Sequence, residues 1–174
     1  MTTGRDGVRE RAFTLAEMVV VVLVLAIAVA IVIASIGTTK DSQAISAARV
    51  LASDVELARN LAVTTQAAHT VLFSSDLQSY KVVANYTGEG YALATAVEHP
   101  VRANEPFVVT LASLNGMESV VVETVNFGGQ AYVTFGAEGD PSNGGSVTLR
   151  SGGTGMVISV EALTGAVSVA RSAE

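Results

Sequence analysis

The sequence predicts an α+β protein in which a long N-terminal helix, membrane-spanning in its first half and amphipathic in its second half, packs on a C-terminal antiparallel β-sheet domain. Three observations predict this fold. Residues 13–36 are almost wholly apolar, residues 37–65 are amphipathic with a helical period, and residues 66–174 contain short segments of alternating polarity between Gly- and Asn-bearing turns. The 174 residues allow one domain, or one domain and an appendage.

The apolar run is long enough to span a bilayer. From Met18 to Ala34 it carries no polar side chain, and residues 13–36 as a helix cover roughly 36 Å against about 30 Å of hydrocarbon. Arginines precede the run and no basic residue follows it before Lys40, so we expect the N-terminus in the cytoplasm and the chain after Gly37 outside. The alternative is a cleaved signal peptide with its small-residue site at residues 28–30.

Glu17 is the one carboxylate inside the apolar run. A charged side chain costs about 2.5 to 3.5 kcal/mol at the bilayer centre and less near the interface. An acid in such a place is by default a functional hypothesis. The alternative is that Glu17 reaches back to the cytoplasmic headgroups.

The string Arg11-Ala12-Phe13-Thr14-Leu15-Ala16-Glu17, followed by an apolar helix, resembles the class III signal of type IV pilins and type II secretion pseudopilins. The resemblance implies that prepilin peptidase removes residues 1–12 as a basic cytoplasmic leader by cutting between Ala12 and Phe13. It also implies that the new amine of Phe13 is methylated and that Glu17 pairs with the amine of a neighbouring subunit during filament assembly. The family usually has Gly before the cut. Because Ala is the smallest substitute, we expect processing to survive with Ala12.

Residues 37–65 predict an amphipathic helix that lies under the C-terminal domain. Apolar residues recur at three- and four-residue steps from Ile45 to Ala62, and charged residues mostly occupy the other face. No proline occurs before Pro100, so one helix could run nearly unbroken to about Thr64. Gly37 is the expected bend, or a break before a second helix.

Beyond Thr65 the period of the pattern becomes two, which predicts short antiparallel strands in residues 66–174. The nine candidate strands are His69 to Phe73, Tyr80 to Tyr86, Tyr91 to Thr95, Phe107 to Leu111, Ser119 to Asn126, Ala131 to Phe135, Ser146 to Arg150, Met156 to Val160 and Ala166 to Ala170. The pattern of residues 135–167, which begins Phe135-Gly136-Ala137-Glu138-Gly139 and continues into two hairpins, is similar to the C-terminal hairpins of H-type minor pseudopilins.

The sequence predicts neither an enzyme nor a cofactor. Cysteine is absent, and His69 and His99, the two histidines, have no metal-ligand or catalytic-triad spacing. Glu138, Asp140 and Asn143 are weak calcium candidates, but their spacing is not that of an EF-hand and ordinary turn chemistry explains them better.

Nucleic-acid binding is not expected, because 16 acidic residues outnumber 10 basic ones and no basic run occurs.

We therefore expect a minor pseudopilin, a structural subunit of the periplasmic pseudopilus of a type II protein secretion system. It would be a single-pass protein of the bacterial inner membrane, with residues 66–174 as the periplasmic domain. Expected partners are prepilin peptidase, other pseudopilin subunits and the inner-membrane secretion platform, with secreted cargo as a further candidate. One alternative is a minor type IV pilin serving motility, adhesion or DNA uptake. From another class, the alternative is a membrane-anchored or secreted periplasmic β domain that binds a ligand.

Overall fold

The computed structural model describes residues 14–172, apart from the side chains of residues 31–39. The chain divides into two compact units, Met1–Ile36 and Gly37–Glu174. Helix α1 (Leu15–Thr65) begins in the first unit and ends in the second. Its helical backbone continues through Gly37, so the break considered there is wrong.

The first unit contributes the apolar turns of α1. Their described side chains are exposed, among them Leu15 at 83%. In the part of the chain that the structure describes, no helix is both long enough and apolar enough to cross a membrane. The predicted span of residues 13–36 includes Phe13 and the side chains of residues 31–36, which lie outside the described residues, so this part of the fold stays a prediction.

In the second unit, α1 buries a stripe of small and branched apolar residues. Ala44, Ala48, Leu51, Val55 and Ala58 are all at most 1% exposed, and they recur at the three- and four-residue steps of one helix face. These residues share one apolar core with buried side chains of both sheets. The expected helix packed under the β domain is therefore confirmed.

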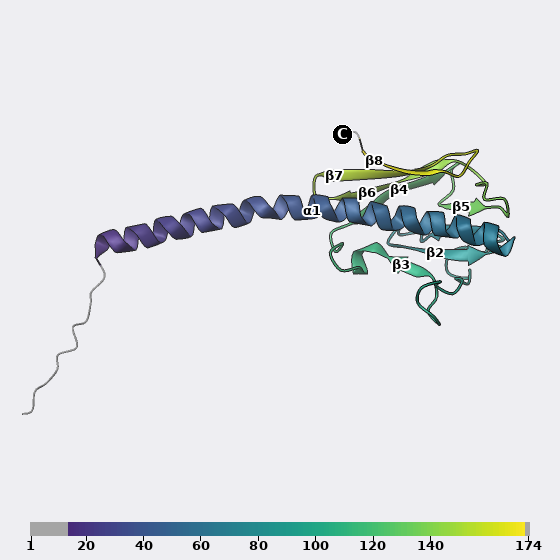
Figure 1. Ribbon diagram of the computed structural model, residues 1–174, viewed down its shortest axis with the longest axis horizontal. Helices are drawn as coiled ribbons and strands as arrows, with labels where there is room; N and C mark the ends of the chain where they lie inside the picture. The colour runs from purple at the N-terminus through teal and green to yellow at the C-terminus, as the bar shows by residue number, and fades with distance from the viewer. Residues whose placement is uncertain (1–13, 173–174) are drawn as a thin grey trace, which may run out of the picture. The chain divides into compact units, whose positions relative to one another are not determined.

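Two four-stranded antiparallel sheets enclose this stripe (Figure 1). The first has the order β3-β2-β1-β5, and the second has the order β4-β6-β7-β8. The strands are β1 (His69–Phe73), β2 (Ser79–Ala84), β3 (Val108–Thr110), β4 (Val121–Phe127), β5 (Tyr132–Phe135), β6 (Gly145–Ser151), β7 (Thr154–Val160) and β8 (Val167–Arg171), and a short 3-10 helix, η1 (Leu111–Ser113), follows β3.

Eight of the nine expected strands are confirmed, with ends that differ by at most two residues. Tyr91 to Thr95 is wrong as a strand, because these residues form a turn. The Tyr91 hydroxyl lies 2.8 Å from Ser79 Oγ, and the Lys81 ammonium lies 4.4 Å from the Tyr91 ring centroid while donating a hydrogen bond to the Ala94 carbonyl. Side-chain contacts therefore hold this segment over the outer face of the first sheet, where Ala94 packs in a second apolar cluster.

Polar contacts join half-buried side chains of α1 to both sheets. The Tyr80 hydroxyl on β2 donates a hydrogen bond of 2.6 Å to Asp54 Oδ2, and burial raises the pKa of Asp54 although this bond opposes the shift. Thr154 Oγ1 on β7 donates to Asp41 Oδ1 at 2.8 Å. Arg59 Nε donates to the Gly139 carbonyl at 3.0 Å. These bonds fix the rotation of the helix relative to the strands.

Gly145 at the start of β6 and Gly153 in the turn after β6 should differ in how well they tolerate a larger side chain. A Cβ on Gly145 would clash with the carbonyl oxygen of Asn126 and lie 2.6 Å from Phe127 Cα, whereas a Cβ on Gly153 meets nothing within 4 Å. Gly145→Ala should lower the free energy of unfolding by about 2 to 3 kcal/mol, because backbone on the paired strand must move. Gly153→Ala, the matched control, should stay within about 0.5 kcal/mol of the native protein. Urea unfolding followed by circular dichroism measures both, and equal stabilities would contradict the packing at Gly145.

Candidate functional site

The predicted assembly residue, Glu17, lies at the start of α1. Ala12 and Phe13 lie outside the described residues. Glu17 occupies the first turn, and its N–H donates to Thr14 Oγ1 at 3.2 Å, as at an N-cap. A carboxylate in the first turn is also favoured by the helix dipole. The Glu17 side chain is exposed, so a partner can reach its carboxylate without rearrangement of the helix.

The three calcium candidates lie on the loop between β5 and β6. Glu138, Asp140 and Asn143 are exposed, and the loop closes as a turn through the Gly136 N–H, which donates to the Asp140 carbonyl at 2.8 Å. Among the described residues, no group of three or more His, Asp or Glu side chains could hold a metal ion. The three residues stay weak calcium candidates, and turn chemistry remains the favoured interpretation of this loop.

The two histidines have separate structural contacts. His69 is buried in β1 with Nδ1 3.0 Å from the Ala67 carbonyl oxygen, and the His99 ring lies 4.6 Å from the Phe107 ring centroid. Neither arrangement resembles a catalytic pair.

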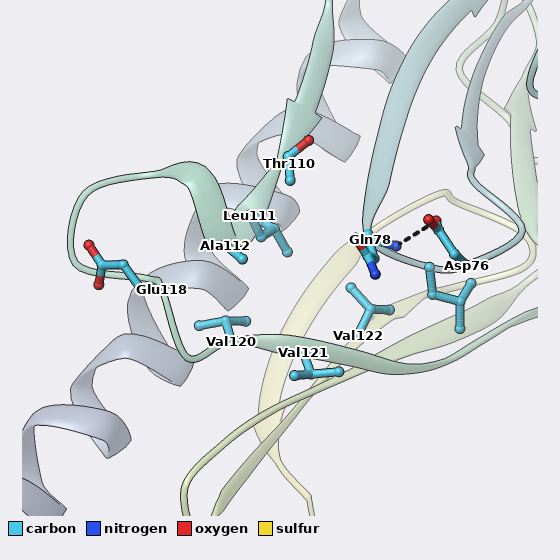
Figure 2. A pocket seen from close by; sticks show the side chains of 10 residues that line it. Asp76, Gln78, Thr110, Leu111, Ala112, Glu118, Val120, Val121 and Val122 are labelled. Carbon is cyan, nitrogen blue, oxygen red and sulfur yellow. Dashed lines mark hydrogen bonds between the residues drawn. The ribbon is translucent and has the colours of Figure 1, made fainter.

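A groove of about 340 Å³ lies where the edge strand of one sheet approaches the edge strand of the other. Its walls come from the turn between β1 and β2, from the end of β3 with η1, and from the segment that leads into β4 (Figure 2). The lining residues are Asp76, Leu77, Gln78, Thr110, Leu111, Ala112, Glu118, Val120, Val121 and Val122.

The floor of the groove is apolar. Leu111, Val120 and Val122 are buried and belong to the main core, so other core side chains pack against the floor of the groove. Val121 is 61% exposed, which leaves a large apolar side chain at the rim. Burial of a partner's apolar side chain here would stabilise the contact by about 25 cal/mol per Å² of apolar surface removed from water.

Two carboxylates flank this apolar floor, Asp76 and Glu118 (Figure 2). Hydrogen bonds from Ser74 Oγ at 2.6 Å and from the Gln78 N–H at 3.1 Å lower the pKa of Asp76. Bonds from its own N–H and from the Gly116 N–H lower the pKa of Glu118. Both side chains therefore stay ionised at neutral pH. None of the described residues that line the groove is Lys or Arg, so the groove suits a partner's apolar side chain flanked by a basic one.

Sequence reasoning missed the groove because its residues come from three separate segments. Residues 76–78, 110–112 and 118–122 meet only through the pairing of β3 with β2 and the packing of β4. The signal that could have indicated the groove is the run Val120-Val121-Val122 beside an acidic turn. Side chains alternate between the two faces of a strand, so at least one of three consecutive valines lies on the exposed face.

Residues 47–165 match the protein family described as Type II transport protein GspH. The fold is similar to that of the minor pseudopilin EpsH from the type II secretion system of Vibrio cholerae. One EpsH structure has a TM-score of 0.56 and 11% identity over 77% of this chain and 97% of EpsH. A second has a TM-score of 0.54 and 10% identity over 74% and 97%.

The fold is also similar to that of the type IV minor pilin FimU from Pseudomonas aeruginosa. Its TM-score is 0.51 at 17% identity, over 76% of this chain and 92% of FimU. At such identities the solved structures establish a shared fold. No curated protein matches the sequence significantly.

Proposed function

The chain belongs to the GspH family of type II transport proteins, and on that premise we propose that it is a minor pseudopilin, a structural subunit of the periplasmic pseudopilus of a type II secretion system. The observation that carries the proposal is the agreement of two parts of the chain that do not overlap. The family match begins at residue 47, whereas the prepilin-like string ends at Glu17. If the prepilin-like string were a coincidence on an unrelated ligand-binding domain, a GspH-type domain would not be expected to follow it.

In this function residues 13–36 hold the subunit in the inner membrane with the leader, residues 1–12, in the cytoplasm. Prepilin peptidase cuts between Ala12 and Phe13 and leaves a methylated amine on Phe13. The exposed Glu17 carboxylate then pairs with the amine of a neighbouring subunit. At 4 Å and an effective dielectric near 20, two opposite charges attract by about 4 kcal/mol before desolvation, which is enough to set the axial register of packed helices.

The periplasmic domain supplies surfaces to the other minor subunits, the secretion platform or the cargo. The acidic, apolar groove is the candidate contact, because it combines a supported apolar floor with two ionised carboxylates. Interface anchors are usually apolar or aromatic side chains in such desolvated hollows.

A minor type IV pilin is the second candidate, favoured by the structural similarity to FimU. The two candidates share cleavage, membrane storage and assembly, and differ in the machine that the filament serves. Deletion of the gene in its host separates them, since loss of an exported enzyme indicates the secretion system, whereas loss of twitching, adhesion or transformation indicates a pilus.

The mass of the native N-terminus tests the processing step. We expect intact mass and N-terminal peptide mapping of the membrane-extracted protein to give a chain that begins at Phe13 with one added methyl group. A chain that begins at Met1 would contradict cleavage at Ala12. A chain that begins at Ile31 would indicate an ordinary secreted domain and would overturn the proposal.

Glu17 tests the assembly step. Glu17→Ala should abolish incorporation into filaments but leave membrane insertion intact, because it removes a charge that a plain anchor does not need. Glu17→Asp, the matched control, keeps the charge and should retain part of the assembly. Filament yield by shearing and membrane yield by carbonate extraction give the two readouts. Normal assembly of Glu17→Ala would contradict the proposed pairing.

Val121 tests the groove. Val121→Asp should change the free energy of unfolding by no more than about 0.5 kcal/mol, because the side chain is exposed, yet it should reduce assembly or secretion in the host. Val101→Asp is the matched control, since Val101 is 82% exposed on a loop outside the groove. Equal behaviour of the two variants would exclude the groove as a contact surface.

A further inference from the structure

The edges of the two sheets are unequally protected. Each sheet has two edge strands, β3 and β5 in the first and β4 and β8 in the second. An edge strand presents unpaired backbone N–H and C=O groups that another chain can join. Natural proteins block such edges with short strands, proline, bulges, charges or a covering segment.

Three of the four edges carry one of these devices. β3 has three residues and follows Pro106 closely. β5 is covered by the chain itself, since the Ser142 N–H donates to the Thr134 carbonyl at 2.7 Å. β4 has a register shift between Val122 and Thr124, with the charged Glu123 at the shift.

On β8 the single such feature is the charge of Arg171, the last residue of the strand. It pairs with β7 over five residues, Val167–Arg171, without a register shift, and it contains no proline and no charge before Arg171. Within the described residues 14–172, no segment other than β7 is hydrogen-bonded to this strand. β8 is thus an open edge near the C-terminus of the chain (Figure 1).

The hydrogen bonds at the two ends of β8 establish which residues face outward. The Glu161 N–H donates to the Ala166 carbonyl, and the Ser172 N–H donates to the Gly155 carbonyl. Hydrogen-bonded pairs alternate along an antiparallel ladder, so Ser168 and Ala170 also pair with β7. The remaining residues, Val167, Val169 and Arg171, therefore direct their N–H and C=O groups to the open side.

A hollow beside β8 gives an added strand room for a side chain. It measures about 300 Å³ and is lined by Glu56, Arg59 and Asn60 of α1 and by Ala166 and Val167. Arg59 is held by the Gly139 carbonyl, and Glu56 and Asn60 are exposed one helical turn apart. The lining offers a carboxylate, a guanidinium and an amide, so it suits a polar side chain.

We propose that the open edge of β8 is an interaction site that accepts an extended strand from a different pilin-like subunit and extends the order β4-β6-β7-β8 by one strand. This inference rests on the proposed function, because it takes the partner to be another subunit of the filament. Main-chain hydrogen bonds to Val167, Val169 and Arg171 would provide the affinity, and a polar side chain in the hollow would provide the specificity.

A second copy of this chain fits the edge less well. Three of the five side chains of its own β8, Val167, Val169 and Ala170, are apolar, whereas the hollow is lined mostly by charged and amide groups. Two β8 strands paired antiparallel would also form a closed two-fold contact, whereas a filament grows through head-to-tail contacts.

Photocrosslinking in the native host tests the site with the full-length chain. A benzophenone amino acid replaces Ser168 on β8 or, as the matched control, Thr148 on the interior strand β6. We expect a crosslink at position 168 that mass spectrometry maps to an extended segment of a different pilin-like subunit, with no such product at position 148. No product at 168 above the control would overturn the proposal, and so would a product with an isotope-labelled second copy of this chain.

Val169→Pro separates an edge effect from a folding defect. It removes an outward N–H without removing a bond to β7, so the crosslink at 168 should be lost while the thermal midpoint stays near that of the control Val169→Thr. Survival of the crosslink in Val169→Pro would overturn the strand-pairing mode. If the crosslink is absent but the chain begins at Phe13 and enters filaments, the β8 proposal fails alone and the proposed function stands.

Discussion

The packing of the alanine-rich stripe of α1 against both sheets is the contact on which the rest of the domain depends. Each sheet buries apolar side chains in one shared core with Ala44, Ala48, Leu51 and Val55. Among the strands of the described residues, none is hydrogen-bonded into both sheets. A larger side chain in place of one of these small residues would push both sheets away from the helix at once.

This central helix sets the surface features that bear on function. Because both sheets pack against the same helix, their edge strands β3 and β4 lie near each other, with the apolar-floored groove between them. At the other border of the second sheet, β8 lies beside the exposed turns of α1 that carry Glu56 and Asn60. The two candidate contacts thus involve opposite edges of the second sheet, which suits a subunit with more than one neighbour.

The buried polar groups in the β domain are consistently satisfied. Lys81, 7% exposed, combines a hydrogen bond to the Ala94 carbonyl with the face of the Tyr91 ring, and no buried side-chain N or O atom of the described residues lacks a partner. A buried polar group without a hydrogen bond costs about 1 to 3 kcal/mol. The contacts of Lys81 therefore stabilise the loop that contains Tyr91 and Ala94 over the first sheet.

The sequence by itself determined the elements whose signals are local. Apolar spacing along residues 45–62 predicted the buried helix face, and period-two alternation between turns predicted eight of the strands correctly and one wrongly, because both patterns arise within a single element. The string at residues 11–17 is contiguous and needed no structure to be seen. Only the tertiary structure decided the pairing order, the turn at Tyr91 and the open edge of β8. Residues 76–78, 110–112 and 118–122 form one groove through long-range register, and such register depends on contacts between distant segments that no local pattern contains.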